Sequence, residues 1–271
     1  MTTYGKPDQN QRVKKFARTG LNPGERIRYS RQLKVPEFGE EGQKKLRGSH
    51  VLIAGIGGLG CASAATLTAA GVGRITLVDF DAVELSNLNR QVLYGVEDLG
   101  KRKVDVAQRK LSLLNPEVEL IPIFERIADE NVFSLIRGVQ VVLDGLDNFH
   151  TRLLVNAACV KHKIPYIHGG VARFRGLITT ILPGETPCLA CVYPEGSPGG
   201  EGLGVLGAVP GVIANLQVLE AIKIMIGHGP SLAGKLLRFN GNDMKFRIED
   251  IKRNERCSVC SPGPVNKAQS V

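Results

Sequence analysis

An apolar run that closes on a cluster of glycines constrains the fold of this chain more than any other feature. Residues 51–54 are apolar, and the glycines that follow keep the spacing G-x-G-x-x-G, namely Gly55, Gly57 and Gly60, with Gly58 between them. The pattern predicts a buried strand over 50–54, a tight turn and a helix over 58–70. Such a turn brings backbone N–H groups and a helix N-terminus close to a phosphate, so we expect a phosphorylated ligand there. A tight strand-to-helix turn without a ligand is the alternative interpretation.

The segment after the predicted helix favours a nucleotide over a bare phosphate. Residues 74–78 predict a second strand, which completes a β-α-β unit and ends on Asp79, 19 residues after Gly60. In Rossmann-type sites a carboxylate at this place binds a ribose hydroxyl. We therefore expect Asp79 to contact the sugar, the alternative being a solvated loop carboxylate.

Amide and cationic side chains are concentrated beyond this unit. Arg90 follows Asn87 and Asn89, and Lys103 is predicted to begin a helix that ends near Leu114. A nicotinamide dinucleotide needs few such groups, whereas a triphosphate attacked at its α-phosphorus needs Lys, Arg and a metal to neutralise its charge. The helix macrodipole opposes a Lys at a helix N-terminus, and a bound anion would offset that cost. We expect Arg90 and Lys103 to bind phosphates, the alternative for each being a solvated surface.

A third predicted strand ends in carboxylates. The largely apolar residues 139–143 lead into Asp144 and Asp147, with Asn148 next. Strand ends line the ligand crevice of a doubly wound sheet, and Mg²⁺ that bridges phosphates takes one or two carboxylates plus water. We expect Asp147 to bind magnesium. The alternative is that Asp147 caps a helix predicted over 151–160.

Two C-x-x-C pairs, separated by 65 residues, predict a structural zinc site of the Cys₄ type, with ligands Cys188, Cys191, Cys257 and Cys260. Disulfides are the disfavoured alternative, because the chain starts without the apolar core of a signal peptide and cytosolic thiols are kept reduced. We expect zinc to fasten the C-terminal tail to the main domain. A catalytic zinc is not expected, since four thiolates leave no open coordination position.

The pattern as a whole predicts an α/β fold, a Rossmann-like doubly wound sheet whose parallel N-terminal half continues into antiparallel strands. The strand over 176–182 follows the one over 164–167 with no helix between, and a terminal pair is predicted at 235–239 and 244–248. Residues 205–226 are apolar over nearly a membrane-spanning length, but polar side chains interrupt them. We expect a core or interface helix there and no membrane span.

The basic charge is concentrated at the N-terminus. The formal net charge is +9, and residues 1–31 alone hold eight basic and two acidic side chains. The remainder has no long basic run interleaved with aromatics, so we expect no nucleic-acid partner, while a modestly cationic surface suits an acidic protein. We predict a flexible basic arm over 1–24, one domain over 25–261, a tail over 262–271 and a cytoplasmic location.

In combination these motifs resemble the MoeB/ThiF/HesA family of adenylating enzymes, relatives of the adenylation domain of ubiquitin-activating enzymes. The resemblance covers about residues 26–261, and it rests on segments 28–32, 55–60, 79–81, 86–91, 144–149 and 216–223, on Lys103 and on both C-x-x-C pairs. It implies that ATP with Mg²⁺ adenylates the C-terminal glycine carboxylate of a ubiquitin-like sulfur carrier protein and releases pyrophosphate. It also implies a homodimer in which Arg31 crosses into the neighbouring site.

The resemblance extends the set of nucleotide-site residues. It implies that Gly58 belongs to the nucleotide loop, that Asp79 binds the ribose and that Asp147 binds magnesium. It also implies that Asn87, Arg90 and Lys103 bind the phosphates. The full set of nucleotide contacts that we expect adds Asp81, Ser86, Asn87, Arg90, Lys103 and Asn148 to the glycine turn. The implied carrier is a MoaD- or ThiS-like protein ending in Gly-Gly, for molybdopterin or thiamin biosynthesis, and a separate sulfur-donor protein is a further expected partner.

Other functions fit parts of the sequence. A dinucleotide-dependent oxidoreductase would leave Arg90, Lys103 and Asp147 unexplained, and a non-catalytic scaffold would not need the complete set of phosphate and metal groups. A different carrier or a small carboxylic acid could replace the sulfur carrier as substrate.

The cysteines outside the zinc pairs predict no covalent intermediate on the enzyme. Relatives that resemble ThiF carry a Cys at the position that matches Gly200, and Cys61 and Cys159 are interpreted as buried packing thiols. Cys61 lies near a helix N-terminus, which would favour a thiolate. We nevertheless expect the reaction to stop at the acyl-adenylate.

Overall fold

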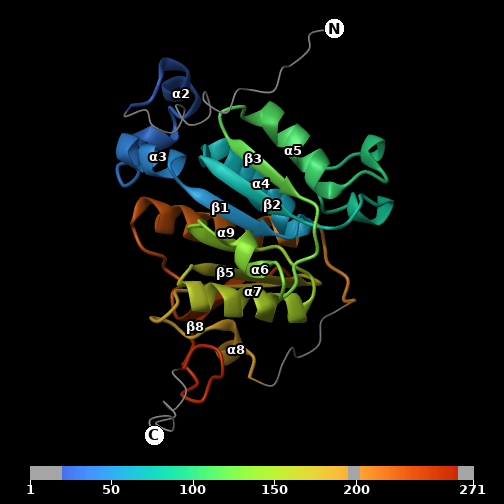
Figure 1. The fold of residues 1–271 in the computed structure, drawn as a ribbon, viewed down its shortest axis with the longest axis vertical. Helices are drawn as coiled ribbons and strands as arrows, with labels where there is room; N and C mark the ends of the chain where they lie inside the picture. Colours follow the sequence, from blue (N-terminus) through green and yellow to red (C-terminus); the bar gives the residue numbers. More distant parts are fainter. Residues whose placement is uncertain (1–19, 195–201, 262–271) are drawn as a thin grey trace, which may run out of the picture.

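The computed structural model describes residues 20–194 and 202–261 (Figure 1). Its strands are β1 (His50–Ala54), β2 (Arg74–Val78), β3 (Glu119–Ile123), β4 (Val141–Asp144), β5 (Tyr166–Ala172), β6 (Arg175–Ile181), β7 (Lys235–Asn240) and β8 (Lys245–Asp250). Its α-helices are α2 (Pro23–Arg28), α3 (Gly39–Arg47), α4 (Gly58–Ala70), α5 (Lys103–Leu114), α6 (Val132–Leu135), α7 (Phe149–His162), α8 (Leu189–Val192) and α9 (Ala208–Ile226). Short 3₁₀ turns are η1 (Gln32–Lys34), η2 (Leu85–Asn87) and η3 (Val96–Asp98).

The described residues form an eight-stranded sheet in the order β3-β2-β1-β4-β5-β6-β7-β8. The strands from β3 to β5 are parallel, and β6, β7 and β8 are antiparallel to their neighbours. The predicted fold class is therefore confirmed. The order reverses between β1 and β4, and such switch points of doubly wound sheets are where ligands bind.

Both faces of the sheet are covered, which explains why β1 reads as one continuous apolar run. Val51 and Ile53 point into a core with α3, α4, α5 and α9, whereas Leu52 and Ala54 point into a second core with α6, α7 and α8. In Figure 1 helices α2 and α3 lie at one end of the molecule, and α8 and β8 lie at the other. The central strands thus have helices on both sides, and their carboxyl ends are left to form a site.

Two glycines of the turn after β1 are required by close backbone contacts. Gly55 has φ +87°, and a Cβ there would lie 2.7 Å from the carbonyl oxygen of Gly145. A Cβ on Gly60 would lie 2.0 Å from the carbonyl oxygen of Gly55. Close packing of the turn against the end of β4 and against its own helix is therefore enough to require glycine at these two positions. This agrees with the alternative interpretation, in which the turn needs no ligand.

Helix α9 belongs to the core. It is the helix, among the described residues, that is long and apolar enough to cross a membrane. It packs against α4, β5 and β6, and its Glu220 is 3% exposed. The Glu220 carboxylate accepts hydrogen bonds from the Thr180 hydroxyl and the Leu232 amide, both at 2.8 Å. These contacts match the predicted core helix.

The structure departs from the predicted boundaries at two places. Helix α2 was not predicted, and it begins inside the segment predicted as an arm. Asn22 and Glu25 cap it reciprocally, at 2.9 and 2.7 Å, and Leu21 is buried. Residues 1–19 and 262–271 lie outside the described part, so the arm and the tail stay predictions.

Strand β5 continues to Ala172, past the predicted end at residue 167. Its pairing with β6 includes Gly169 and Gly170. A Cβ on Gly169 would lie 2.7 Å from the Gln217 side chain. The glycine thus serves close packing of α9 on the strand instead of ending it.

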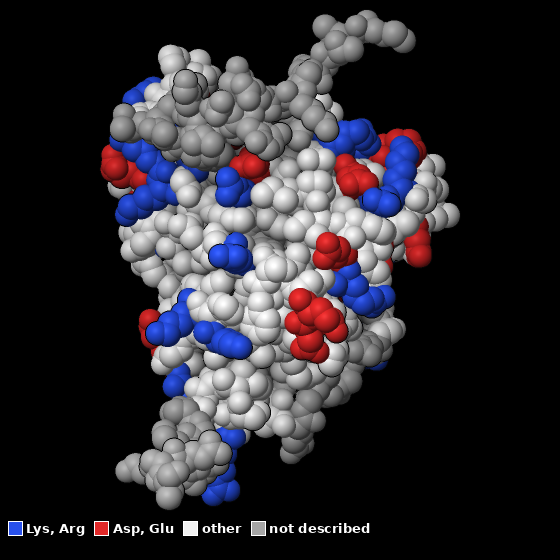
Figure 2. Space-filling view, viewed as in Figure 1, with Lys and Arg blue, Asp and Glu red and all other residues white. Residues whose placement is uncertain are grey.

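Charged side chains on the face in Figure 2 form small separate groups, with Asp and Glu among the Lys and Arg. The described part of this face therefore lacks a continuous basic surface of the kind that binds nucleic acid.

Candidate active site

A pocket of about 560 Å³ lies at the carboxyl ends of β1, β2 and β4 and extends along β5 and β6. Nine of the predicted nucleotide-site residues line it, namely Gly55, Gly57, Gly58, Asp79, Asp81, Arg90, Lys103, Asp147 and Asn148. These residues come from five separate segments of the chain, and the topology brings them together. Gly60, Ser86, Asn87 and Arg31 are not among the lining residues.

Asp79 holds the glycine turn in place. Its Oδ2 accepts a hydrogen bond from the Ile56 amide at 2.7 Å, and its Oδ1 accepts one from the Asp81 amide at 2.8 Å. The residue is 8% exposed, and burial raises the pKa of its carboxyl although Lys103 opposes that shift. The interpretation of Asp79 as a solvated loop carboxylate is therefore wrong. The ribose contact stays a prediction.

Lys103 is buried at the N-terminus of α5 and points into the pocket. Its Nζ donates to Asp81 Oδ2 at 2.8 Å, and its side chain is 6% exposed. The alternative of a solvated surface lysine is wrong. An ammonium has three donors, so the Asp81 contact orients Lys103 and leaves donors for a phosphate.

Arg90 lies beside the glycine turn on an exposed segment. Its Nη1 donates to the Ser86 carbonyl oxygen at 2.9 Å and to Asn89 Oδ1 at 3.1 Å. Asn87 is buried, and its Oδ1 accepts from the Glu84 amide at 3.1 Å. In this structure Asn87 therefore stabilises η2, which precedes Arg90, and its predicted phosphate contact stays a prediction.

Asp147 is exposed on the pocket wall, and Asn148 is the cap of α7. Asn148 Oδ1 accepts a hydrogen bond from the Thr151 amide at 2.9 Å. The alternative that Asp147 caps this helix is therefore wrong, because the cap is the next residue, Asn148. The Asp147 carboxylate lines the same pocket as the glycine turn, and its predicted contact with Mg²⁺ stays a prediction.

Three buried polar residues next to this loop were not predicted as site residues. Asp144, at the end of β4, lies 2.6 Å from His168 Nδ1 and 3.1 Å from Arg152 Nε. Arg152 also donates to the carbonyl oxygens of Leu146 and Gly169. The three residues connect β4, β5, α7 and the loop of Asp147. Asp144 stood out in the sequence only as a carboxylate at a strand end, and Arg152 and His168 gave no signal because each looked like an ordinary helix or strand residue.

The end of the pocket near Asp79 holds another unpredicted pair. The Arg126 guanidinium lies 3.6 Å from the centre of the Phe80 ring, and both residues line the pocket beside Ile127. A planar cation stacked on an aromatic ring, with an apolar neighbour, forms a surface that suits a flat heterocycle. Phe80 follows Asp79 directly in the sequence. Arg126 is far from Phe80 along the chain, so no local pattern predicted that the two side chains are in contact.

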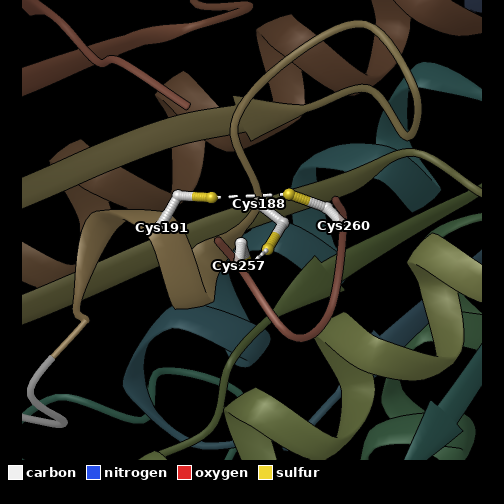
Figure 3. A group of neighbouring side chains, drawn as sticks. All are labelled: Cys188, Cys191, Cys257 and Cys260. Atoms are coloured by element: carbon white, nitrogen blue, oxygen red, sulfur yellow. Dashed lines mark hydrogen bonds between the residues drawn. The ribbon is translucent and has the colours of Figure 1, made fainter. Parts of the chain in front are cut away.

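The four predicted zinc ligands converge at the far end of the molecule (Figure 3). Their sulfur atoms lie within 4.8 Å of one another, with 3.7 Å between Cys188 and Cys257 and 3.4 Å between Cys191 and Cys260. These separations are too long for disulfides, with bonds of about 2.05 Å. They approach the spacing of about 3.8 Å that a tetrahedral Zn–S distance of 2.3 Å requires. The donor set therefore fits zinc, which would join α8 to residues 257–260.

The other two cysteines are packing thiols, as predicted. Cys61 and Cys159 are fully buried. Burial raises the pKa of Cys61 to about 12, and it also raises the pKa of Cys159. Neither thiol is therefore a nucleophile near neutral pH. The position of Gly200 lies outside the described residues.

Comparison with known proteins gives a consistent set of relatives. A model of the ThiF family matches residues 29–259. The adenylyltransferase and sulfurtransferase MOCS3 of Drosophila yakuba is 43% identical over 91% of this chain and 56% of its own length. The sulfur carrier protein adenylyltransferase of Thermus thermophilus is 41% identical over 89% of this chain and 92% of its own length. This chain thus spans just over half of MOCS3 but nearly all of the bacterial relative.

Solved structures agree with the fold. E. coli MccB with ATP superposes with a TM-score of 0.76 at 27% identity, over 86% of this chain and 74% of that one. MccB with the peptide MccA-N7isoASN superposes with a TM-score of 0.78 at 26% identity, over 87% and 75%.

Proposed function

The chain belongs to the ThiF family, and from this membership and the geometry of the pocket we propose that it is an ATP-dependent adenylyltransferase. Its proposed substrate is the C-terminal glycine carboxylate of a ubiquitin-like sulfur carrier protein. The observation that carries the proposal is the convergence of Arg90, Lys103 and Asp147 with the glycine turn on one pocket. The names of relatives at 39–43% identity support a protein carrier, including a SAMP-activating enzyme E1 of Haloferax volcanii.

The residues of the pocket suit phosphoryl chemistry without an enzyme nucleophile. A carboxylate oxygen of the carrier bonds to the α-phosphorus of ATP, and the bond from that phosphorus to the α,β-bridging oxygen breaks, so the electron pair leaves with pyrophosphate. The carboxylate is already an anion and needs no base, so alignment and charge neutralisation supply the acceleration. Lys103, oriented by Asp81, and Arg90 are the proposed cations. Mg²⁺ bound at Asp147 would neutralise phosphate charge.

The test of this function is exchange of labelled pyrophosphate into ATP, with purified MoaD-like and ThiS-like carriers that end in Gly-Gly. We expect exchange that requires both ATP and a carrier, because the adenylation step is reversible. A carrier lacking its last glycine is the matched control and should give none. Pyrophosphate exchange in the absence of any carrier would contradict the proposal. So would an enzyme that shows no exchange with any carrier but turns over a nicotinamide cofactor. The carrier that reacts would also indicate whether the pathway makes molybdopterin or thiamin.

We further propose that the active form is a homodimer with shared sites. Arg31 is exposed and does not line the pocket of its own chain, which suits a residue that acts in the neighbouring site. Mixing Arg31→Ala subunits with Lys103→Ala subunits should then restore one intact site in each heterodimer. After complete subunit exchange in an equal mixture, about a quarter of wild-type exchange activity is expected.

The control for this experiment is a mixture of Asp147→Asn and Lys103→Ala subunits. Both residues line one pocket within one chain, so every site in these heterodimers stays defective. Equal recovery in the two mixtures, or no recovery in either, would show that Arg31 does not act across the interface. Cytoplasmic location and a separate sulfur-donor protein stay predictions.

A further inference from the structure

A buried histidine lies on the pocket wall, across β4 from the glycine turn. His168 is on β5, its side chain is 2% exposed, and it lines the same pocket as Lys103 and Asp147. The sheet order β2-β1-β4-β5 puts the phosphate-binding groups on one side of the Asp147 loop and His168 on the other. The substrate that attacks the α-phosphorus must enter from the side that the triphosphate does not occupy. His168 is therefore placed beside the incoming substrate.

The hydrogen bonds around His168 determine which of its nitrogens carries the proton. Burial raises the pKa of the Asp144 carboxyl, but Arg152 and His168 outweigh this effect and hold that pKa below its usual value. Asp144 is therefore ionised and can only accept hydrogen bonds. The short contact of 2.6 Å to His168 Nδ1 then requires the proton on Nδ1.

The other ring nitrogen is left as an acceptor. Burial lowers the pKa of His168, so the ring is neutral near pH 7 and Nε2 carries a lone pair. Among the described residues, Asp144 is the hydrogen-bond partner of this ring, through Nδ1, and Nε2 has none. With Nδ1 committed to Asp144, the ring edge left for the pocket carries Nε2. Because His168 lines the pocket, this acceptor can take a hydrogen bond from a donor that enters the pocket.

The surroundings of His168 suggest what that donor is. Apolar side chains also line this pocket, among them Val171, Leu177 and Val205, and the Tyr193 ring lies edge-on to the imidazole with 6.0 Å between the ring centroids. A backbone N–H that is buried needs a hydrogen-bond acceptor, and an apolar pocket wall offers few acceptors to a bound peptide tail. The tail's carboxylate must lie at the α-phosphorus, so its last peptide N–H lies a few ångströms behind.

We propose that His168 Nε2 accepts a hydrogen bond from the last peptide N–H of the acyl substrate and thereby positions its carboxylate for attack. This inference rests on the proposed function, because it assumes a polypeptide substrate that is adenylated at its C-terminus. Asp144 and Arg152 act through His168, since they fix its tautomer and orientation. His168 is a specificity residue for a peptide backbone and is not required for nucleotide binding.

The test removes the N–H from the substrate. A Gly-Gly carrier is made by semisynthesis with glycolic acid as its last residue, so that an ester oxygen replaces the N–H and the carboxylate remains. For the wild-type enzyme we expect kcat/KM in the exchange assay to fall about tenfold with the ester carrier, with an unchanged KM for ATP. For His168→Asn we expect a low rate with both carriers and a difference between them of about twofold or less. The Asn amide can still donate to Asp144 but does not reach the position of Nε2.

Two further variants complete the design. His168→Gln places an amide oxygen near the position of Nε2, so its preference for the N–H carrier should return. Val171→Ala alters the same pocket wall but keeps His168, so it should retain the wild-type ratio between the carriers. Equal rates of wild-type enzyme with the two carriers, or the same ratio in wild type and His168→Asn, would overturn the proposal. Absence of exchange by wild-type enzyme with the unmodified carrier would contradict the proposed function itself.

Discussion

Replacing Asp147 by Asn should lower carrier-dependent pyrophosphate exchange about a hundred- to a thousandfold while the protein stays folded. The substitution keeps the size of the side chain and removes the charge that would bind Mg²⁺ between the phosphates. The fold should survive because Asn148 caps α7 by accepting a hydrogen bond from the Thr151 amide, and the substitution at Asp147 leaves that cap in place. Initial exchange rates over a magnesium titration, with circular dichroism as the measure of folding, are the measurements.

Asp129→Asn is the matched control for this variant. Asp129 is exposed and is not among the pocket-lining residues, so the same change of charge there should leave the exchange rate unchanged. A rate for Asp147→Asn close to that of wild type at limiting magnesium would show that the metal is bound elsewhere. A parallel loss in both variants would instead point to a general effect of net charge.

Replacing Cys188 by Ser should reduce bound zinc from about one equivalent to nearly none and lower the melting temperature by several degrees. Cys188 begins α8 and is 1% exposed, and its sulfur faces those of the C-terminal pair. Loss of one thiolate leaves three ligands, so the metal can no longer hold residues 257–260 against α8. Zinc content by atomic emission and melting by calorimetry measure the two effects.

The structure offers a control thiol outside the cluster. Cys159→Ala removes a fully buried sulfur from α7, so it should cost stability through lost packing but leave the zinc content unchanged. If Cys188→Ser lost its zinc without any change in melting temperature, the metal would not contribute to the stability of the fold. Wild-type protein that purifies without zinc and binds none would contradict the site altogether.

The chemistry of this site was predictable wherever a local pattern sets it. The spacing of Gly55 to Gly60 reflects backbone contacts within one turn, and the position of Lys103 reflects the start of one helix. The two C-x-x-C pairs could be matched across the chain, because tetrahedral zinc binding by thiolates leaves few other roles for such pairs. Family resemblance strengthened each assignment, and the match over residues 29–259 confirms the family.

Choices between neighbouring residues needed the tertiary structure. Asp147 and Asn148 are both good helix caps, and the turn after β4 decides that Asn148 reaches the Thr151 amide. Only the structure shows that Asn87 Oδ1 accepts a hydrogen bond from the amide of Glu84, the N-cap of η2, while its phosphate contact stays a prediction. One residue of difference in a loop changes which side chain faces the pocket, and the sequence pattern does not resolve loops at that scale.

The sequence by itself determined the β-α-β unit, the parallel-to-antiparallel order and the metal-binding cysteines, because these depend on periodicity and spacing along the chain. Only the tertiary structure decided that Asp144, Arg152 and His168 form one buried network, or that Arg126 stacks on Phe80. Those contacts join residues of different strands and helices, and they depend on strand register and on how deeply each group is buried. Arg152 and His168 keep Asp144 ionised against the effect of its burial, and the hydrogen bond to Asp144 fixes the tautomer of His168. The features that distinguish this side of the pocket therefore arise from packing and not from any local motif.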